Sequence, residues 1–370
     1  MTDLEIYKLA DNVLSTITRD LTESVYTSLQ GDLSLCWDER PKFNAWAESR
    51  ALPNEPPIHK ICLHYELVRQ IYRDAEDYYN FTEDELQQEK FLRFFKNINL
   101  TSTSLPLASF SKEDCITNMF LAALTWVYFH ELGHLIQEHG YIRSKYGVNS
   151  KSDQAIHECD INYSNNLIEK AAALNHTTEI AADFEATSYC IFELFRHFTD
   201  ESLVTKESKG EEFFDAIYLF VCGLSCIFHR FNDTKSPPSD DKPKGSHPHP
   251  IIRMEFSFPN IIETLEILNG TKLIKHFLNR SELVHLYSRA SVSSTLFWLS
   301  KYGKKSDKLE NLMLHGIYNR PLLKSYCSII INTWDEIEQD IKSIRRFGTP
   351  TGLISFTDEF RNQVFKVERI

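Results

Sequence analysis

The amino-acid sequence predicts an α+β protein that is mainly α-helical, with one small β-sheet in its N-terminal part. Apolar side chains recur every three or four positions through most of the chain, which is the spacing of amphipathic helices. Short apolar segments divided by prolines lie between residues 33 and 64 and are typical of strands. Only 12 of the 370 residues are glycine, and they form no dense turn clusters, which favours helices further.

Composition narrows the class of protein and its partners. The formal net charge of −12 argues against non-specific binding to nucleic acid or to an anionic membrane surface. The N-terminus has no basic region followed by an apolar stretch, so we expect no secretory signal. The eight cysteines include no Cys-x-x-Cys pair, which is typical of reduced thiols. We therefore expect a cytoplasmic protein with neither nucleic acid nor a membrane as partner.

The first part of the chain is expected to form an amphipathic helix, a set of strands and two more helices. The sheet follows from the segments between the prolines, and the helices from their periodicity. In order, we expect a helix at 3–29, strands at 33–37, 43–48 and 58–64, and helices at 66–79 and 83–95.

The most apolar expected helix begins after a cap at Ser111 and ends at His139, with Gly140 as its stop. It is apolar on every side before His130, so we expect it to lie at the centre of the core. The polar segment 141–175 is expected to be irregular.

Further helices are expected at about 179–198, opened by Thr177 and Thr178, and at about 211–231. Residues 232–246 have the composition of a loop, and helical segments resume from 261 to about 366. The sequence thus predicts an N-terminal domain, residues 1–255, and a helical C-terminal extension, residues 256–370.

The central helix carries His130-Glu131-Leu132-Gly133-His134, an HExxH motif. Residues four apart share one face of a helix, so His130 and His134 can direct two imidazoles at one ion. Glu131 is offset around the helix and can reach a water that such an ion holds. Two nitrogen ligands beside a carboxylate base are the arrangement of a zinc hydrolase.

A zinc site of this kind needs a third protein ligand. Position 140, where one extended form of the motif has a third histidine, is a glycine. Glu179 and Asp183, four apart among apolar neighbours, supply an alternative: Glu179 as the ligand and Asp183 as acceptor for a ligand imidazole. On a continuous helix His139 would face away from His130, so we expect it at the helix C-terminus. The competing ligands are His157, Glu158, Asp160 and His176.

These motifs together resemble the gluzincin zinc metallopeptidases, in the lineage with HELGH, then an E-x-x-A-D helix, then HP-x4-R. Soluble Lit-type phage-exclusion peptidases share this layout most closely, and the HtpX-type membrane peptidases are broader relatives. Residues 43–47 resemble the NAxA strand of the lineage, and residues 58–64 fall where its substrate-binding edge strand should follow. The resemblance covers about residues 40–255 and implies a gluzincin-like catalytic core.

The resemblance also implies roles for the His-Pro segment. His247 and Arg253 would line the site and donate to the oxyanion that forms at the scissile carbonyl. His249 is an alternative to His247, and Arg253 could instead pair with an acid. An extended protein or peptide substrate would lie along the edge strand.

We therefore expect a zinc-dependent endopeptidase with Zn²⁺ held by His130, His134 and Glu179. Its narrower form would be an anti-phage, abortive-infection protease of narrow specificity. A rival form is a toxin-like protease held inactive until a trigger or partner protein acts. The alternative is a regulatory or binding protein with a structural zinc site and no protease activity.

Overall fold

The computed structural model describes residues 1–84, 89, 109–146, 155–157, 169–199, 209–231, 242–271, 273, 278–302 and 321–366. These residues are mainly helical, with one small mixed sheet, as the sequence predicts. The elements are α1 (Asp3–Leu21), a π-helical turn (Thr22–Tyr26), β1 (Asp32–Asp38), β2 (Ala45–Ser49), β3 (Ile58–His64), α2 (Tyr65–Glu83), α4 (Lys112–Ile136), α5 (His139–Lys145), β4 (Ala155–His157), α7 (Glu169–Thr199), α8 (Lys209–Phe231), α9 (Pro250–Asn269), α10 (Arg280–Tyr302), α12 (Pro321–Ile344) and α13 (Asp358–Phe365).

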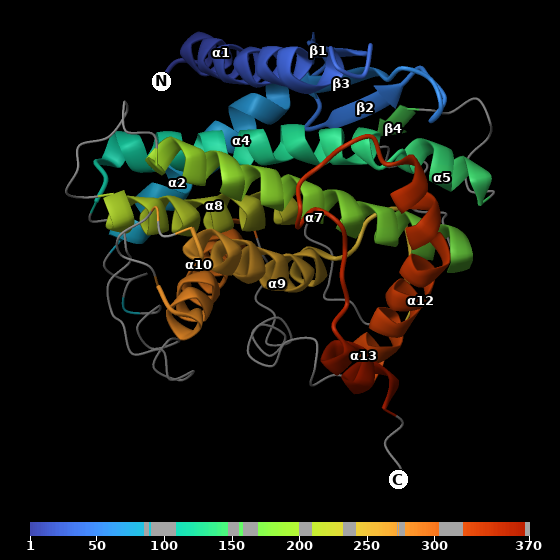
Figure 1. Ribbon diagram of the computed structural model, residues 1–370. Helices are drawn as coiled ribbons and strands as arrows, with labels where there is room; N and C mark the ends of the chain where they lie inside the picture. Colours follow the sequence, from blue (N-terminus) through green and yellow to red (C-terminus); the bar gives the residue numbers. More distant parts are fainter. Residues whose placement is uncertain are drawn as a thin grey trace.

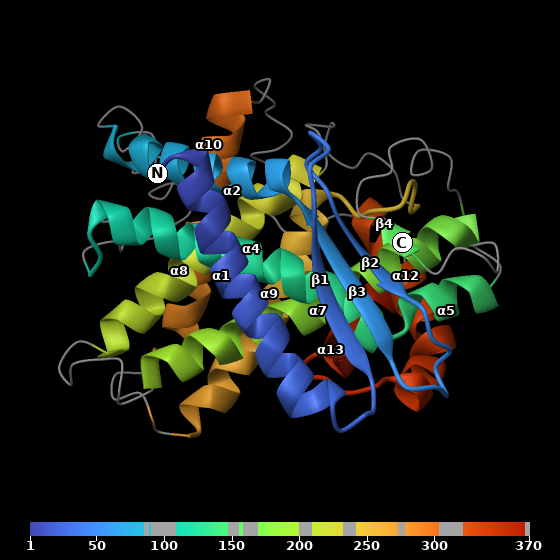
Figure 2. The same ribbon diagram turned by 90° about the horizontal axis from the view of Figure 1, so that it is seen from above.

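The sheet has the strand order β1-β3-β2-β4, and α1 lies beside β1 (Figures 1 and 2). β3 pairs with β1 in parallel and with β2 in antiparallel orientation. The prediction that residues 58–64 form an edge strand is therefore wrong, because both sides of β3 already carry backbone partners. Among the described residues, β1 and β4 are the outer strands.

α4 lies between the sheet on one side and α7 and α8 on the other (Figure 1). Ser111 caps its first turn by accepting from the backbone N–H of Asp114, as predicted. Almost every side chain from Trp126 to Ile136 is buried, so this helix has no solvent face there. The sequence of α4 is apolar on all sides because the sheet, α7 and α8 surround the helix.

Two helix boundaries differ from the prediction. α4 ends at Ile136, and Gly140 lies inside α5, because Glu138 adopts a left-handed conformation (φ 51°) that turns the chain. α7 begins at Glu169, not near residue 179. The hydroxyls of Thr177 and Thr178 bond to carbonyls four residues earlier, so these threonines sit inside the helix and do not open it. The helix expected at 83–95 and the loop at 232–246 lie largely outside the described residues.

The described part of the C-terminal region packs directly on the helices of the central core. The predicted division at residue 255 falls inside α9, which is continuous from Pro250 to Asn269. α12 contributes Trp334 and its buried neighbours to a second apolar cluster, which it shares with Ile180 and Phe184 of α7. Residues 345–352 then cross the junction of α4 and α7: Arg345 pairs with Glu185 at 2.7 Å, and Arg346 with Glu138 at 2.7 Å.

Within the part of the chain that the structure describes, two helices, α4 and residues 211–231 of α8, are long and apolar enough to cross a membrane by length and composition. In the fold they are core helices: 83% and 94% of their most apolar stretches are buried inside the protein. Packing in the core accounts for their composition.

Three buried histidines give a prediction about acid stability. Burial lowers the pKa of His59, His176 and His229 to about 3, from an ordinary value of 6.5. Each therefore stabilises the fold fully above pH 6.5, and this contribution is lost as the pH falls from 6.5 towards 3. We expect the free energy of unfolding to decrease by roughly 1.4 kcal/mol per pH unit for each histidine in this window.

Urea unfolding between pH 4 and 7 measures this slope. His229 stacks on Trp298 at the α8–α10 contact, so His229→Phe keeps an aromatic ring there. The variant should take up about one proton fewer on unfolding. An unchanged pH slope in that variant would contradict the assignment.

Candidate metal centre

His130 and His134 of α4 and Glu179 of α7 bring three ligand atoms together in the interior. The two Nε2 atoms are 3.1 Å apart. Nε2 of His130 lies 3.2 Å from Oε2 of Glu179, and Nε2 of His134 lies 3.4 Å from Oε1. Bond lengths of about 2.0–2.1 Å in a tetrahedral zinc site give ligand–ligand distances of roughly 3.3 Å, which these values match. The buried group can thus bind a metal ion, and its donor set of two imidazoles and one carboxylate suits zinc.

His130 is oriented by an acid that is itself oriented by an arginine. Oδ1 of Asp183 lies 2.9 Å from Nδ1 of His130. The guanidinium of Arg253 donates twice to Asp183, from Nε at 2.8 Å and from Nη2 at 2.5 Å. An ionised carboxylate only accepts hydrogen bonds, so Nδ1 of His130 carries the proton and its Nε2 lone pair is directed at the ion. Of the two roles considered for Arg253, pairing with an acid and donating to an oxyanion, the structure shows the pairing with an acid.

His134 is contacted by His139, which helical spacing alone predicts to face away. The left-handed turn at Glu138 reverses the chain, so Nδ1 of His139 lies 2.8 Å from Nδ1 of His134. Nε2 of His139 lies 3.2 Å from Oε1 of Gln137. Burial holds the pKa of His139 well below its usual value, so the ring is neutral.

Glu179 is contacted by Arg143 of α5, whose Nη2 donates to Oε1 at 2.8 Å. The same guanidinium donates from Nε to the hydroxyl of Thr178 at 2.9 Å. Burial alone would raise the pKa of Glu179, but the imidazoles of His247, His134 and His130 outweigh it and hold the pKa well below the usual value. The carboxyl group is therefore an anion, the form that binds a metal.

Glu131 is fully buried on α4, next to His130. The two helices approach closely here: a Cβ atom on Gly133 would lie 3.1 Å from the carbonyl oxygen of Ala182 and 3.3 Å from Cβ of Glu185. Small residues at positions 133 and 182 therefore allow Glu179 to reach the histidine helix.

The two histidines of the His-Pro segment lie in different places. Nε2 of His247 is 3.6 Å from Oε2 of Glu179, and its side chain is 18% exposed, whereas the side chains of the three ligands are at most 2% exposed. His249 caps α9, where Nδ1 accepts from the backbone N–H of Ile251. Of this pair, His247 is therefore the residue at the centre.

The competing ligands expected from 157–176 do not join this group in the described residues. His176 lies inside α7 and contacts the hydroxyl of Tyr326 at 2.8 Å. The backbone of His157 belongs to β4, while Glu158 and Asp160 lie outside the described residues. Within the described residues, the metal-binding group consists of His130, His134 and Glu179.

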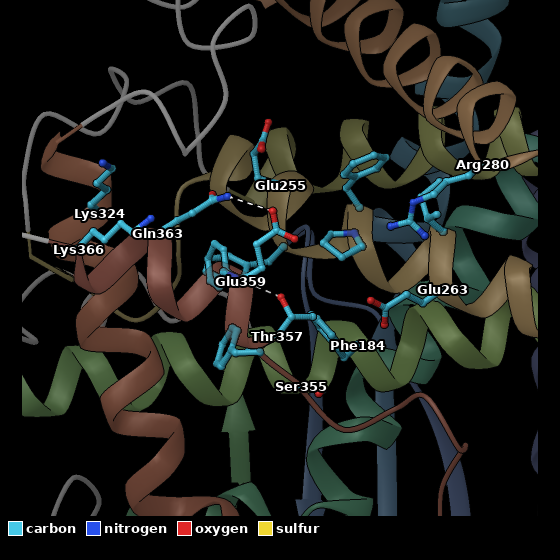
Figure 3. A pocket seen from close by; sticks show the side chains of 16 residues that line it. Phe184, Glu255, Glu263, Arg280, Lys324, Ser355, Thr357, Glu359, Gln363 and Lys366 are labelled. Atoms are coloured by element: carbon cyan, nitrogen blue, oxygen red, sulfur yellow. Dashed lines mark hydrogen bonds between the residues drawn. The ribbon is translucent and has the colours of Figure 1, made fainter.

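A cavity of about 820 Å³ opens elsewhere, between α9 and α13 with Phe184 of α7 at one side (Figure 3). Phenylalanines line it together with both acidic and basic side chains, among them Glu263, Arg280 and Lys366. None of the three ligands, nor Glu131 or His247, lines this cavity. It is distinct from the metal centre.

Comparison of the chain with models of known protein families, with curated proteins and with solved structures gave no match. The site must therefore be interpreted from its own geometry. Sequence reasoning did not single out two buried residues of this geometry, Gln137 and Arg143. It placed a third, His139, at the helix C-terminus and away from the site, which is wrong because His139 contacts His134. The signal that could have found them is the run of polar residues 137–139, which begins three positions after His134 in a stretch that is typical of a helix end.

Proposed function

We propose that this chain is a zinc-dependent endopeptidase of the gluzincin type. The observation that carries the proposal is the convergence of His130, His134 and Glu179 at zinc-like distances, with the buried acid Glu131 beside them. The order of the motifs, HELGH and then EIAAD, supports the gluzincin type. When bound, zinc supplies a Lewis acid and lowers the pKa of a water at the site towards neutrality.

The chain's own residues have separable roles in this proposal. Glu131 takes the proton of the attacking water and later gives it to the leaving amine. His247 donates to the oxyanion of the tetrahedral intermediate. Asp183 orients His130, and Arg253 holds Asp183 in place.

The substrate class is an extended segment of a protein. β3 is internal, so a substrate strand that joins this sheet must pair with β1 or β4, the outer strands of the described sheet. The ligands are almost fully enclosed, with His247 partly exposed. This enclosure supports a protease at rest that a trigger opens, and we propose the anti-phage, narrow-specificity form on that ground and on the Lit-type layout.

Metal content tests the proposal at its base. The wild-type protein should bind one zinc ion, measured by atomic absorption, and Glu179→Ala should lose most of it because one of three ligands is removed. Zinc at about 100 times its Kd should stabilise the wild type by about 2.7 kcal/mol and the variant much less. Asp215→Asn, which changes a buried acid on α8 beside Ser109, is a control that should keep the metal. Equal zinc content in wild type and Glu179→Ala would remove Glu179 from the site.

A regulatory protein with a structural zinc site is the second candidate, favoured by the same enclosure. Structural zinc is usually held by four protein ligands, and His247 is near enough to Glu179 to be the fourth. Loss of zinc from His247→Ala would support this candidate. Retained zinc with lost cleavage would support the peptidase.

A further inference from the structure

The helix α5 directly follows the HExxH helix and is only seven residues long. His139 and Arg143 lie four residues apart, on one face of α5, and both are buried. One touches His134 and the other touches Glu179, so a single short helix contacts two of the three ligands.

Gln137, His139 and His134 form a row of hydrogen bonds, and the other contacts of Gln137 determine which atom donates in each of them. Its Nε2 donates to the carbonyl oxygens of Ala181 at 3.3 Å and Gly352 at 3.2 Å, and to Oε2 of Glu185 at 3.3 Å. All three partners only accept, so this atom is the amide nitrogen and Oε1 of Gln137 is the acceptor that faces His139.

The proton positions follow step by step. Because Oε1 of Gln137 accepts, Nε2 of His139 carries the proton of that ring. The Nδ1 atoms of His134 and His139 are 2.8 Å apart and share one proton. His134 can bind an ion through Nε2 only if its own proton is on Nδ1, so Nδ1 of His134 donates and Nδ1 of His139 accepts. The Nε2 lone pair of His134 is then directed at the ion, in the same sense as the lone pair that Asp183 imposes on His130.

Arg143 acts on the third ligand in the same way. Its guanidinium is fixed by two bonds, one to Oε1 of Glu179 and one to the hydroxyl of the preceding Thr178. The charge-assisted bond from Nη2 therefore holds Oε1 of Glu179 in place. Oε2, which lies 3.2 Å from Nε2 of His130, remains directed at the ion.

We propose that His139 and Arg143 are positioning residues that orient His134 and Glu179 for the metal, with Gln137 fixing the tautomer of both histidines. This inference rests on the proposed metal site and adds a set of supporting residues outside its motifs. It places the control of metal affinity in the turn and short helix after HELGH.

The test measures zinc affinity and the tautomer of His134 in His139→Phe, which keeps a ring but removes the acceptor. Loss of such a supporting contact typically weakens metal binding about 10- to 100-fold, and we expect a change of that size. In the metal-free protein, ¹⁵N imidazole spectra should show the proton of His134 on Nδ1 in the wild type and moved towards Nε2 in the variant.

Three further variants separate positioning from folding. His139→Asn places a carbonyl oxygen where Nδ1 lies and should restore most of the affinity, whereas Arg143→Met should weaken it independently. The control is His229→Phe. His229 is a buried histidine of α8 that contacts Thr295, and its replacement should leave the zinc affinity unchanged. If His139→Phe does not fold, Gln137→Met carries the same tautomer test with the imidazole in place.

The outcomes distinguish this inference from the proposed function. A wild-type protein without zinc affinity would overturn both. Wild-type zinc binding with unchanged affinity and an unchanged His134 tautomer in His139→Phe would overturn the positioning role alone.

Discussion

Glu131→Gln should keep bound zinc and lose proteolysis. The substitution preserves the size of a fully buried side chain, so we expect the fold and the three ligands to be unaffected. An amide cannot take up the proton of the attacking water, and loss of a general base typically lowers kcat by about 10²- to 10⁴-fold. New peptide termini in cells that express the wild type, compared with cells that express the variant, measure this loss whatever the substrate is.

Zinc content of the two purified proteins is the control for this comparison. Equal zinc with lost cleavage assigns the base. Full cleavage by Glu131→Gln would show that another residue activates the water, and the HExxH assignment of roles would fail.

Arg253→Met should have the largest effect on stability. Arg253 and Asp183 are each at most 2% exposed, and the guanidinium also lies 4.4 Å from the ring centre of Phe228. Without the arginine, the buried carboxylate of Asp183 loses its neighbouring cation and the two hydrogen bonds that Arg253 donates to it. Breaking a buried pair on one side typically costs about 3–5 kcal/mol, so we expect a loss of about that size in urea unfolding.

Arg361 provides a matched control. It also holds an acid by two bonds, both of 2.7 Å to Asp335, but the two side chains are 30% and 43% exposed. Solvent screens such a pair, so Arg361→Met should cost less than about 1 kcal/mol. Similar losses in the two variants would refute the view that Asp183 depends on Arg253. Arg253→Met combined with Asp183→Asn should recover part of the stability.

The sequence predicted the elements of the fold well because helical spacing and proline-divided strands are local signals. It also predicted that Glu179 meets His130 and His134 across 45 or more residues. That contact was predictable because acids among alanines and isoleucine are costly to bury without a partner, and the histidines are such a partner.

The remaining features depend on contacts that sequence spacing does not reveal. β3 becomes internal because β1 pairs with it in parallel, and its residues fit an edge strand equally well. His139 reaches His134 because the helix breaks at Glu138, in a left-handed conformation that glycine or asparagine would have signalled and glutamate does not. Arg346 pairs with that glutamate from 208 residues away.

This distant pairing has a consequence for the order in which the centre is completed during protein synthesis. The motif helix and its turn leave the ribosome early, but Arg345, Arg346 and Gly352, which contact Glu185, Glu138 and Gln137, are made well over a hundred residues later. A nascent chain that already contains every metal ligand still lacks the partners of the turn that supports them. The growing polypeptide would therefore complete the surroundings of the centre only after residues 345–352 have been made.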